Sequence, residues 1–301
     1  MLDLCRNTQP IERQPLPDTF SRKLESAFAA YGQLCVGIDP HPELLEEQGL
    51  VQSPEGLYAF SMQMLEGISG VVGIVKPQVS FFERFGSEGF AVLERVLSEA
   101  NRAGLLVIAD AKRGDIGTTM AAYADAWLAK DAPFICDALT VNPYLGVGAL
   151  LPAVTAAVER GKGLFVLAAT SNPEALGLQS AKTVELTVAK AIADQVSSLN
   201  HQIAQSKSVF GSIGLVLGAT VDLDSFGLAN TNVGSAQQRT PILAPGFGAQ
   251  GARLADAKNI FDKDSDSVLY SISRSALRNG LQNLTRTLEN DKEELLQALT
   301  K

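Results

Sequence analysis

The fold follows from the stretch Leu105-Leu106-Val107-Ile108-Ala109-Asp110-Ala111-Lys112-Arg113-Gly114-Asp115. Its apolar first half predicts a buried strand, and charged side chains of alternating sign come next. Asp110 and Lys112 are separated by one residue, so on a strand they share a face. Asp115 comes after Gly114, where the chain can turn freely. Charges at the end of so apolar a strand are costly to bury unless they pair or meet a ligand. The pattern therefore indicates a functional site, with an ion pair that merely caps the strand as the alternative.

Eight short apolar runs, this one included, recur along the chain at fairly regular intervals. They are apolar on both faces, which predicts strands of a parallel sheet that helices cover on each side. The runs are Leu34–Ile38, Val71–Val75, Leu105–Ala109, Ala138–Val141, Leu164–Ala168, Ile213–Leu217, Pro241–Ala244 and Val268–Ile272.

Amphipathic segments with a helical period lie between the runs. The first begins with Ser53 and Pro54, an N-cap residue and a proline at the first helical position. Eight strand–helix units in one chain predict an α/β protein with a (β/α)8 TIM barrel. A doubly wound open sheet is the alternative, because the eight runs could also be counted as seven. The helical segments are residues 54–68, 87–103, 118–130, 147–160 and 181–205.

Residues 1–301 are expected to form a single domain, because no linker rich in Pro, Gly or Ser divides the chain. Residues 1–30 are expected to form an N-terminal extension, with 1–20 as an arm or outer packing segment. The polar stretch 227–239 is typical of a loop insertion, and the Glu- and Leu-rich tail 286–301 predicts a terminal helix.

Composition restricts the partners and the compartment. The chain has 33 Asp and Glu against 25 Lys and Arg, a formal net charge of -8, so a nucleic-acid or anionic-membrane surface is not expected. The cysteines are odd in number, and Cys35 and Cys136 lie in apolar runs, which indicates buried thiols in a reducing compartment. The chain shows no secretory signal and no apolar stretch of about 18 residues, so a soluble cytoplasmic protein is expected.

Polar residues follow the first five predicted strands, at the ends where a barrel enzyme keeps its chemistry. The opposite strand ends are plainer, so solubility alone does not explain the pattern. The residues are Asp39 after the first strand, Lys76 after the second, Asp110 and Lys112 after the third, Asn142 after the fourth, and Thr170 with Ser171 after the fifth.

The last two strands are followed by features typical of a phosphate site. Pro245-Gly246-Phe247-Gly248-Ala249-Gln250-Gly251 is a glycine-rich loop that leads towards residues 252–259, which have a helical pattern. Backbone N–H groups in such a loop favour a phosphate. Arg274 directly follows the eighth strand and offers a guanidinium fork to phosphate oxygens. In barrels these two loops frequently bind phosphate.

Other chemistries have weaker support. His41 is the single histidine near the strand ends, so a serine–histidine–carboxylate triad is not expected. Asp39, Asp110 and Asp115 could together hold a magnesium ion. The Lys112 ammonium between two of these carboxylates repels a divalent cation, so neither a metal nor another cofactor is expected.

Several motifs of the chain resemble those of the orotidine 5′-phosphate decarboxylase family. The resemblance rests on Asp110-Ala-Lys112-Arg-Gly-Asp115-Ile-Gly-Thr-Thr119, together with Gly37-Ile38-Asp39-Pro40 and Val75-Lys76-Pro77. Leu139–Tyr144 and Ala244–Gln250 are similar to the longer-chain, type 2 subgroup, and the resemblance covers about residues 30–280. Sugar-phosphate decarboxylases of the same barrel superfamily share the Asp-x-Lys-x-x-Asp element. The Lys76 element and the Pro-Gly-Phe-Gly-Ala-Gln loop favour the narrower family.

The resemblance implies cofactor-free loss of CO2 from orotidine 5′-phosphate, which gives UMP in pyrimidine biosynthesis. Lys76, Asp110, Lys112 and Asp115 would form an alternating charged array. Lys112 would protonate C6 of the pyrimidine, and Asp115 would come from the second subunit of a homodimer with shared active sites.

The resemblance also implies a set of substrate-binding residues. Ser171 would contact the pyrimidine, with Thr170 and Asn172 beside it as competitors. Asp39 and Lys76 would bind the ribose hydroxyls with help from the neighbouring subunit's Thr119, Asn142 would line the site, and Gly246, Gly248, Gln250 and Arg274 would surround the phosphate.

Two functions of other classes stay open on the sequence alone. A magnesium-dependent sugar-phosphate decarboxylase or aldolase on the same scaffold would use Asp39 and Asp110 as ligands, and its activity would be sensitive to chelators. A non-catalytic module that binds a phosphate ligand would keep the phosphate loop and would tolerate loss of Lys112.

Overall fold

The computed structural model describes residues 19–203, 208–228 and 238–301. Nearly all of the expected arm 1–20 and most of the expected insertion 227–239 lie outside these ranges. None of the described helices is long and apolar enough to cross a membrane.

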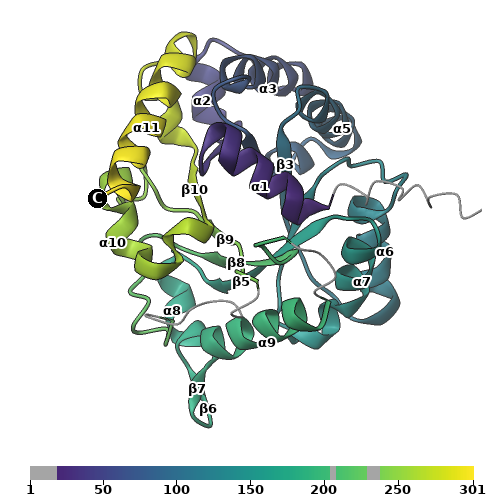
Figure 1. Cartoon of the computed structure of the whole chain (residues 1–301). Helices are drawn as coiled ribbons and strands as arrows, with labels where there is room; N and C mark the ends of the chain where they lie inside the picture. The colour runs from purple at the N-terminus through teal and green to yellow at the C-terminus, as the bar shows by residue number, and fades with distance from the viewer. Residues whose placement is uncertain (1–18, 204–207, 229–237) are drawn as a thin grey trace, which may run out of the picture.

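In the described part of the chain, eight parallel strands close a barrel in the order β1-β10-β9-β8-β5-β4-β3-β2 (Figure 1). β1 pairs with both β2 and β10, so the sheet has no open edge, the TIM barrel is confirmed and the open sheet is wrong. The strands are β1 Leu34–Ile38, β2 Ile74–Pro77, β3 Leu106–Arg113, β4 Ala138–Val141, β5 Gly163–Ala169, β8 Ile213–Leu217, β9 Ile242–Ala244 and β10 Val268–Ile272.

Helices surround this barrel (Figure 1). Four of the predicted helical segments form helices within a few residues of the expected bounds, and the Ser53 hydroxyl caps α3 by accepting the Gly56 N–H at 3.3 Å. The α-helices are α1 Phe20–Tyr31, α2 Pro42–Glu47, α3 Pro54–Ile68, α4 Ser80–Glu83, α5 Gly86–Arg102, α6 Gly117–Leu128, α7 Leu151–Glu159, α8 Leu176–Gln179, α9 Val188–Ile203, α10 Ala257–Phe261 and α11 Leu284–Leu299. The 3-10 helices are η1 Val147–Leu150, η2 Pro173–Ala175, η3 Leu254–Asp256, η4 Asp262–Ser267, η5 Arg274–Leu277 and η6 Leu281–Asn283.

The expected helix over 181–205 is wrong in its first part. Residues 182–187 form a hairpin of β6 (Lys182–Thr183) and β7 (Leu186–Thr187), which projects from the barrel in Figure 1. Val184 at its tip has a positive φ of 64°, which a helix does not allow. The Thr187 hydroxyl accepts the Lys190 N–H at 3.0 Å, so it caps α9 and the helix begins at Val188.

α1 covers the end of the barrel at which the strands begin. Phe20 and Leu24 are fully buried there, and the Phe20 ring meets Phe165 of β5 edge-on at 5.9 Å between centroids. The Phe20 N–H also donates to the Gly161 carbonyl at 2.6 Å. One end of the barrel interior is thus filled with apolar side chains.

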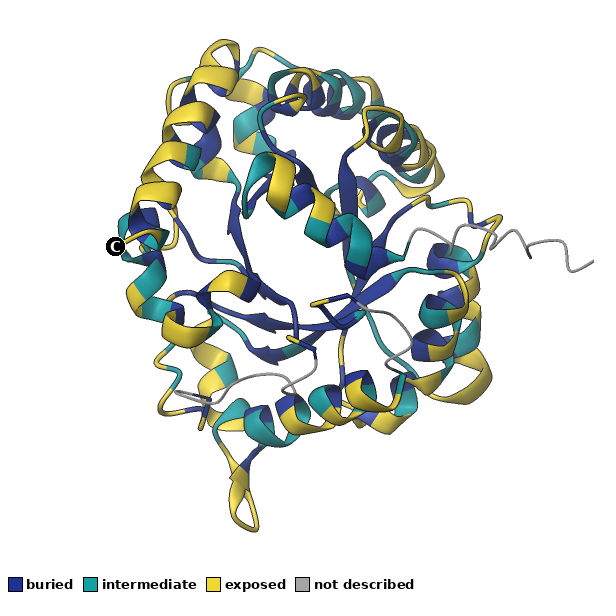
Figure 2. Ribbon diagram, in the orientation of Figure 1, coloured by how far each residue is buried: buried dark blue, intermediate teal, exposed yellow. Residues whose placement is uncertain are grey.

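Side-chain alternation along the strands builds the interior above this layer. Leu106 and Ile108 of β3 belong to the inner core, whereas Val107 and Ala109 belong to the core between strands and helices. The same parity carries Asp110 to the interior, one step nearer the carboxyl end of the strand. The strands are almost entirely buried (Figure 2), so a charge at this position meets other side chains before it meets water.

Candidate active site

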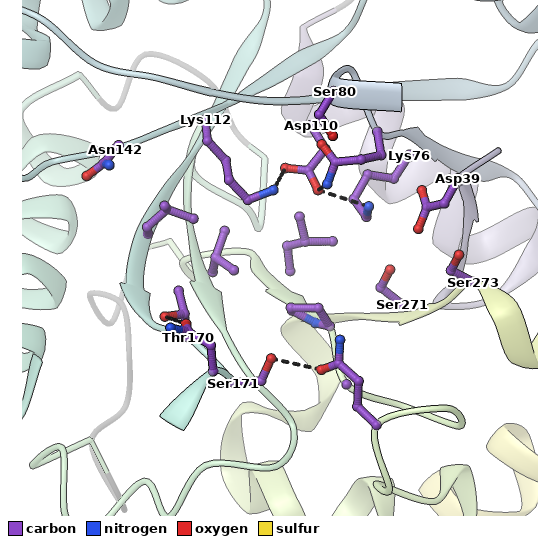
Figure 3. A pocket seen from close by; sticks show the side chains of 18 of the residues that line it. Asp39, Lys76, Ser80, Asp110, Lys112, Asn142, Thr170, Ser171, Ser271 and Ser273 are labelled. Carbon is purple, nitrogen blue, oxygen red and sulfur yellow. Dashed lines mark hydrogen bonds and ion pairs between the residues drawn. The ribbon is translucent and has the colours of Figure 1, made fainter. Parts of the chain in front are cut away.

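The carboxyl ends of the strands surround a cavity of about 620 Å³. Its volume is within the ~300–1,000 Å³ that small-molecule sites occupy. Nine of the twelve predicted site residues line it, and several appear in Figure 3. They are Asp39, Lys76, Asp110, Lys112, Asn142, Ser171, Gly246, Gln250 and Arg274.

Asp110 is the centre of the charged array. The Lys76 ammonium from β2 donates to its Oδ2 at 3.0 Å, and the Lys112 ammonium donates to its Oδ1 at 2.6 Å (Figure 3). Lys76 and Asp110 are only 6% and 7% exposed, whereas the Lys112 side chain is 44% exposed. The alternating charges predicted from the sequence therefore form one network, in which a buried ion pair supports a second, accessible ammonium.

Two neutral donors complete the carboxylate shell. Gln78 donates its side-chain N–H to Asp110 Oδ2 at 3.1 Å, and the Thr140 hydroxyl donates to Oδ1 at 2.9 Å. Each carboxylate oxygen thus accepts one charged and one neutral hydrogen bond, as a buried carboxylate requires.

Burial and charge act in opposite directions on the buried pair. Burial alone would raise the pKa of Asp110, but the ammonium groups of Lys76 and Lys112 reverse this and hold its pKa well below the usual range. Burial alone would lower the pKa of Lys76, and the nearby Asp110 and Asp39 carboxylates instead raise its pKa above the usual range. The pair is therefore fully ionised at neutral pH.

Lys112 departs from the regular strand expected from the sequence. Its φ is 49°, in the left-handed region, which costs a residue with a Cβ about 1–2 kcal/mol. The register between β3 and β4 also shifts between Ala109 and Arg113. The expectation that Asp110 and Lys112 lie on one side is confirmed by their ion pair, but an irregular strand end, rather than a flat one, brings them together.

Asp39 lies on the side of the cavity next to Lys76, with Ser271 and Ser273 of the β10 end nearby (Figure 3). Its Oδ1 is buried and accepts no hydrogen bond from the described residues. A buried carboxylate oxygen without a donor is costly, so this atom is available to a hydroxyl of a bound ligand.

The polar residues after β5 face different neighbours. The Ser171 hydroxyl bonds to the Gln250 side-chain carbonyl at 2.8 Å, across the cavity from Lys112 (Figure 3). The Thr170 hydroxyl bonds to Asn172 at 2.8 Å, and the Thr170 N–H donates to Gln179 at 2.8 Å. Ser171 is thus the hydroxyl that links this turn to the glycine-rich loop.

The glycine-rich loop contributes unequally to the cavity. Gly246 and Gln250 line it, and Gly248 does not. The Gly248 N–H donates to the Ala252 carbonyl at 2.8 Å, and a Cβ at this position would overlap Ser275. The helix expected over 252–259 is η3 followed by the short α10, so it begins later than expected. Arg274 lines the cavity at the start of η5 and pairs with no described acidic side chain.

Asp115 and Thr119 do not line this chain's cavity. The Asp115 carboxylate accepts the N–H of Ile116 at 2.8 Å, and Thr119 is exposed on α6. The expected reason for Gly114 is wrong: its φ is not positive, and a Cβ there would overlap the Asn142 carbonyl oxygen. Gly114 is therefore required by close packing on the β4 end, not by a free turn.

Comparison with known proteins shows the family. The profile of the orotidine 5′-phosphate decarboxylase / HUMPS family matches residues 32–279. The chain belongs to this family. Orotidine 5′-phosphate decarboxylases from Streptomyces coelicolor and Salinispora tropica are 48% identical over 271 residues and 46% identical over 264 residues, each covering 87% of this chain and 91% of the relative.

Solved structures agree with the family. A Streptomyces avermitilis structure that carries the name orotidine 5′-phosphate decarboxylase aligns with a TM-score of 0.85 and 44% identity, covering 94% of this chain and 96% of that one. The Leishmania donovani OMP decarboxylase aligns with a TM-score of 0.73 and 26% identity, covering 94% and 99%.

Two residues that bond to the central carboxylate of this decarboxylase-family site were not among the predicted site residues. Gln78 lies two positions after Lys76, on the same side of the strand end, so alternation could have found it. Thr140 is a lone hydroxyl in the apolar run 138–141, which was itself a signal of a buried polar contact. Ser271 in the run 268–272 gave the same kind of signal.

Proposed function

We propose that the protein decarboxylates orotidine 5′-phosphate to UMP in pyrimidine biosynthesis, with Lys112 as the proton donor. The observation that carries the proposal is the buried Lys76–Asp110 ion pair. The Asp110 carboxylate of this pair also holds the accessible Lys112 ammonium, with 2.6 Å between Asp110 Oδ1 and Lys112 Nζ. The family and the named relatives support the same reaction.

The chemistry requires a fixed positive charge beside C6 of the pyrimidine. The bond from C6 to the carboxylate breaks, CO2 leaves, and the electron pair of that bond stays on C6. A pre-positioned ammonium stabilises this charge without reorganising and then transfers a proton to C6. Lys112 becomes neutral in that step and regains a proton from solvent, with which its exposed side chain is in contact. The reaction written in this way needs no cofactor.

The rest of the cavity supplies binding energy. Arg274, Gln250 and Gly246 support a phosphate site opposite the charged array, and Ser171 beside Gln250 supports a contact to the pyrimidine. The unbonded Asp39 oxygen beside Lys76 supports a contact to a ribose hydroxyl. Binding of the remote phosphate can hold the reacting carbon in place.

The test is to incubate the purified, metal-stripped protein with orotidine 5′-phosphate. We expect loss of the orotate absorbance with stoichiometric release of CO2 and UMP. A preparation that binds UMP but turns over no substrate would remove the decarboxylase assignment and leave a binding module.

A magnesium-dependent sugar-phosphate decarboxylase or aldolase is the weaker alternative. It would need Asp110 as a metal ligand, but both oxygens of this carboxylate already accept an ammonium. No group of three or more His, Cys, Asp or Glu side chains in the described ranges is arranged to hold a metal ion. Activity that a chelator abolishes would favour this alternative.

We also propose a homodimer in which each chain lends Asp115 and Thr119 to its partner's cavity. Neither residue lines its own chain's cavity, which supports this arrangement. The surrounding surface carries large exposed apolar side chains, which are costly to leave in water. They are Ile116, Tyr144, Leu145 and Leu151.

A single domain and a cytoplasmic location remain part of the proposal. α11 packs on α3 and α1 packs on β3, which supports one domain. Cys35 and Cys136 are buried free thiols, as expected for a reducing compartment.

A further inference from the structure

Thr140 occupies the one place where β3 and β4 lose their register. Ala109 pairs with Leu139 and Arg113 pairs with Val141, so three residues of β3 face a single residue of β4 between these pairs. That single residue is Thr140. It is 1% exposed, and a buried hydroxyl has to be hydrogen-bonded to be tolerated there.

The Thr140 hydroxyl is satisfied on both sides. It accepts the backbone N–H of Lys112 at 2.9 Å and donates to Asp110 Oδ1 at 2.9 Å. The same Oδ1 accepts the Lys112 ammonium at 2.6 Å. The contacts form a closed ring from the Lys112 backbone through Thr140 and Asp110 to the end of the Lys112 side chain.

This ring of contacts restrains Lys112, the member of the charged array that has the fewest other restraints. Lys112 has a left-handed backbone, and its side chain is 44% exposed, so packing alone does not fix its ammonium. A lysine side chain has many rotamers, and each contact that restrains it lowers the entropy lost in reaching the reactive geometry. Thr140 restrains both the start of the side chain, through the backbone N–H, and its end, through Asp110.

We infer that Thr140 is a positioning residue, which sets the Lys112 ammonium against C6 without touching the substrate. The inference rests on the proposed function, since it concerns the proton donor of that reaction. The inference predicts that the Thr140 hydroxyl matters more for turnover than for folding or nucleotide binding. A merely structural threonine would matter mainly for folding.

The test compares Thr140→Val with Thr140→Ser. Valine keeps the shape and removes the hydroxyl, and we expect kcat to fall about 10- to 100-fold, since small misplacements of catalytic groups cost that much. KM for orotidine 5′-phosphate and the Kd for UMP should change less than about threefold. Serine keeps the hydroxyl and should retain kcat within about threefold of wild type.

Thr287→Val is the matched control. Thr287 is 1% exposed on α11, and its hydroxyl accepts a hydrogen bond from Asn279 at 3.2 Å, outside the cavity lining. The same chemical change there should leave kcat within about twofold of wild type. Calorimetric titration with UMP counts the intact sites of every variant, so kcat is expressed per competent site.

A Thr140→Val kcat within about twofold of wild type per intact site would overturn the inference, as would a serine variant as slow as the valine variant. If the valine variant does not fold, Thr140→Ala against Thr140→Ser decides on the same criteria. Wild-type protein that does not decarboxylate the substrate at all would reject the proposed function itself, before any variant is compared.

Discussion

A single carboxylate organises the charge of this site, because two ammonium groups and two neutral donors converge on Asp110. The two ammonium groups are not equivalent. Lys76 is buried and balances the carboxylate, whereas Lys112 is accessible from the cavity. We therefore expect removal of Lys76 to affect mainly stability and removal of Lys112 to affect mainly turnover.

Lys112→Ala should lower kcat by several orders of magnitude, because in the proposed mechanism Lys112 supplies both the charge beside C6 and the proton. Lys76 still balances Asp110 in this variant, so the thermal midpoint and UMP affinity should change little. Steady-state kinetics and UMP titration measure the two effects. A kcat within about tenfold of wild type, ~1.4 kcal/mol, would rule out this role.

Lys292→Ala is the matched control for that prediction. Lys292 lies on α11, where its ammonium donates to the Val71 carbonyl at 3.1 Å, outside the cavity lining. Loss of an ammonium at this place should leave kcat unchanged within about twofold.

Asp110→Asn should be destabilising by about 3–5 kcal/mol at neutral pH, because the buried Lys76 ammonium loses the carboxylate with which it forms its ion pair. The depressed pKa of Asp110 gives this difference a pH dependence. The native carboxylate binds its proton less readily than the unfolded one, so its stabilisation is present above the unfolded pKa of about 3.9 and is lost as pH falls towards the native pKa.

Urea unfolding of wild type and Asp110→Asn between pH 3 and pH 7 checks this dependence. The gap between their unfolding free energies should be constant from about pH 5 to pH 7 and should narrow below about pH 4. A gap that widens on acidification would show that the ionised carboxylate is not the stabilising form.

At the residue scale, the sequence predicted that these charged residues come together, but it did not predict the backbone geometry that brings them together. Alternation placed Asp110 and Lys112 on one side, and their ion pair confirms it. The register shift beside Thr140 was not visible, because it depends on how β3 pairs with β4 and no local pattern encodes that pairing. Long-range pairing likewise explains Gly114, whose constraint comes from the carbonyl of Asn142, the residue directly after β4.

At the scale of elements, α1 closes the barrel end opposite the cavity. Phe20→Ala would leave a hole beside Phe165 in this fully buried layer, and we expect a loss of about 3–5 kcal/mol in the free energy of unfolding. The cavity lies at the other end of the strands, so kcat per folded molecule should stay within about twofold. Urea unfolding and kinetics measure the two quantities.

Leu296→Ala serves as the control for Phe20→Ala. Leu296 is 62% exposed on α11, so its truncation should change stability by less than about 0.5 kcal/mol. Equal losses from the two substitutions would mean that Phe20 does not pack as described.

Strands were easier to predict than the connections between them. A strand buried on both faces needs an apolar run, and each of the eight runs contains or overlaps a barrel strand. The stretch 181–187 was expected to be helical as the first part of the amphipathic segment 181–205, but the left-handed Val184 and the Thr187 cap place the helix start later. Backbone dihedral angles and caps at such a boundary depend on what the loop packs against.

At the scale of the whole molecule, the proposed site is incomplete in one chain. Lys112 lines the cavity and Asp115 does not, although only two residues separate them in the sequence. In a symmetric dimer the contacts are reciprocal, so a partner that receives Asp115 also lends its own. We therefore expect Lys112→Ala and Asp115→Ala to be inactive separately and to complement each other when mixed.

The experiment mixes equal amounts of the two variants under conditions of subunit exchange. A mixed dimer has one site that lacks both residues and one site that is wild type. With random exchange about half of the dimers are mixed, and half of their sites work, so about a quarter of wild-type activity should return. If both residues instead belonged to the same chain's site, every site would lack one of them. Mass spectrometry of differently tagged chains establishes that exchange took place, and no recovery despite exchange would reject the shared site while leaving the decarboxylase assignment intact.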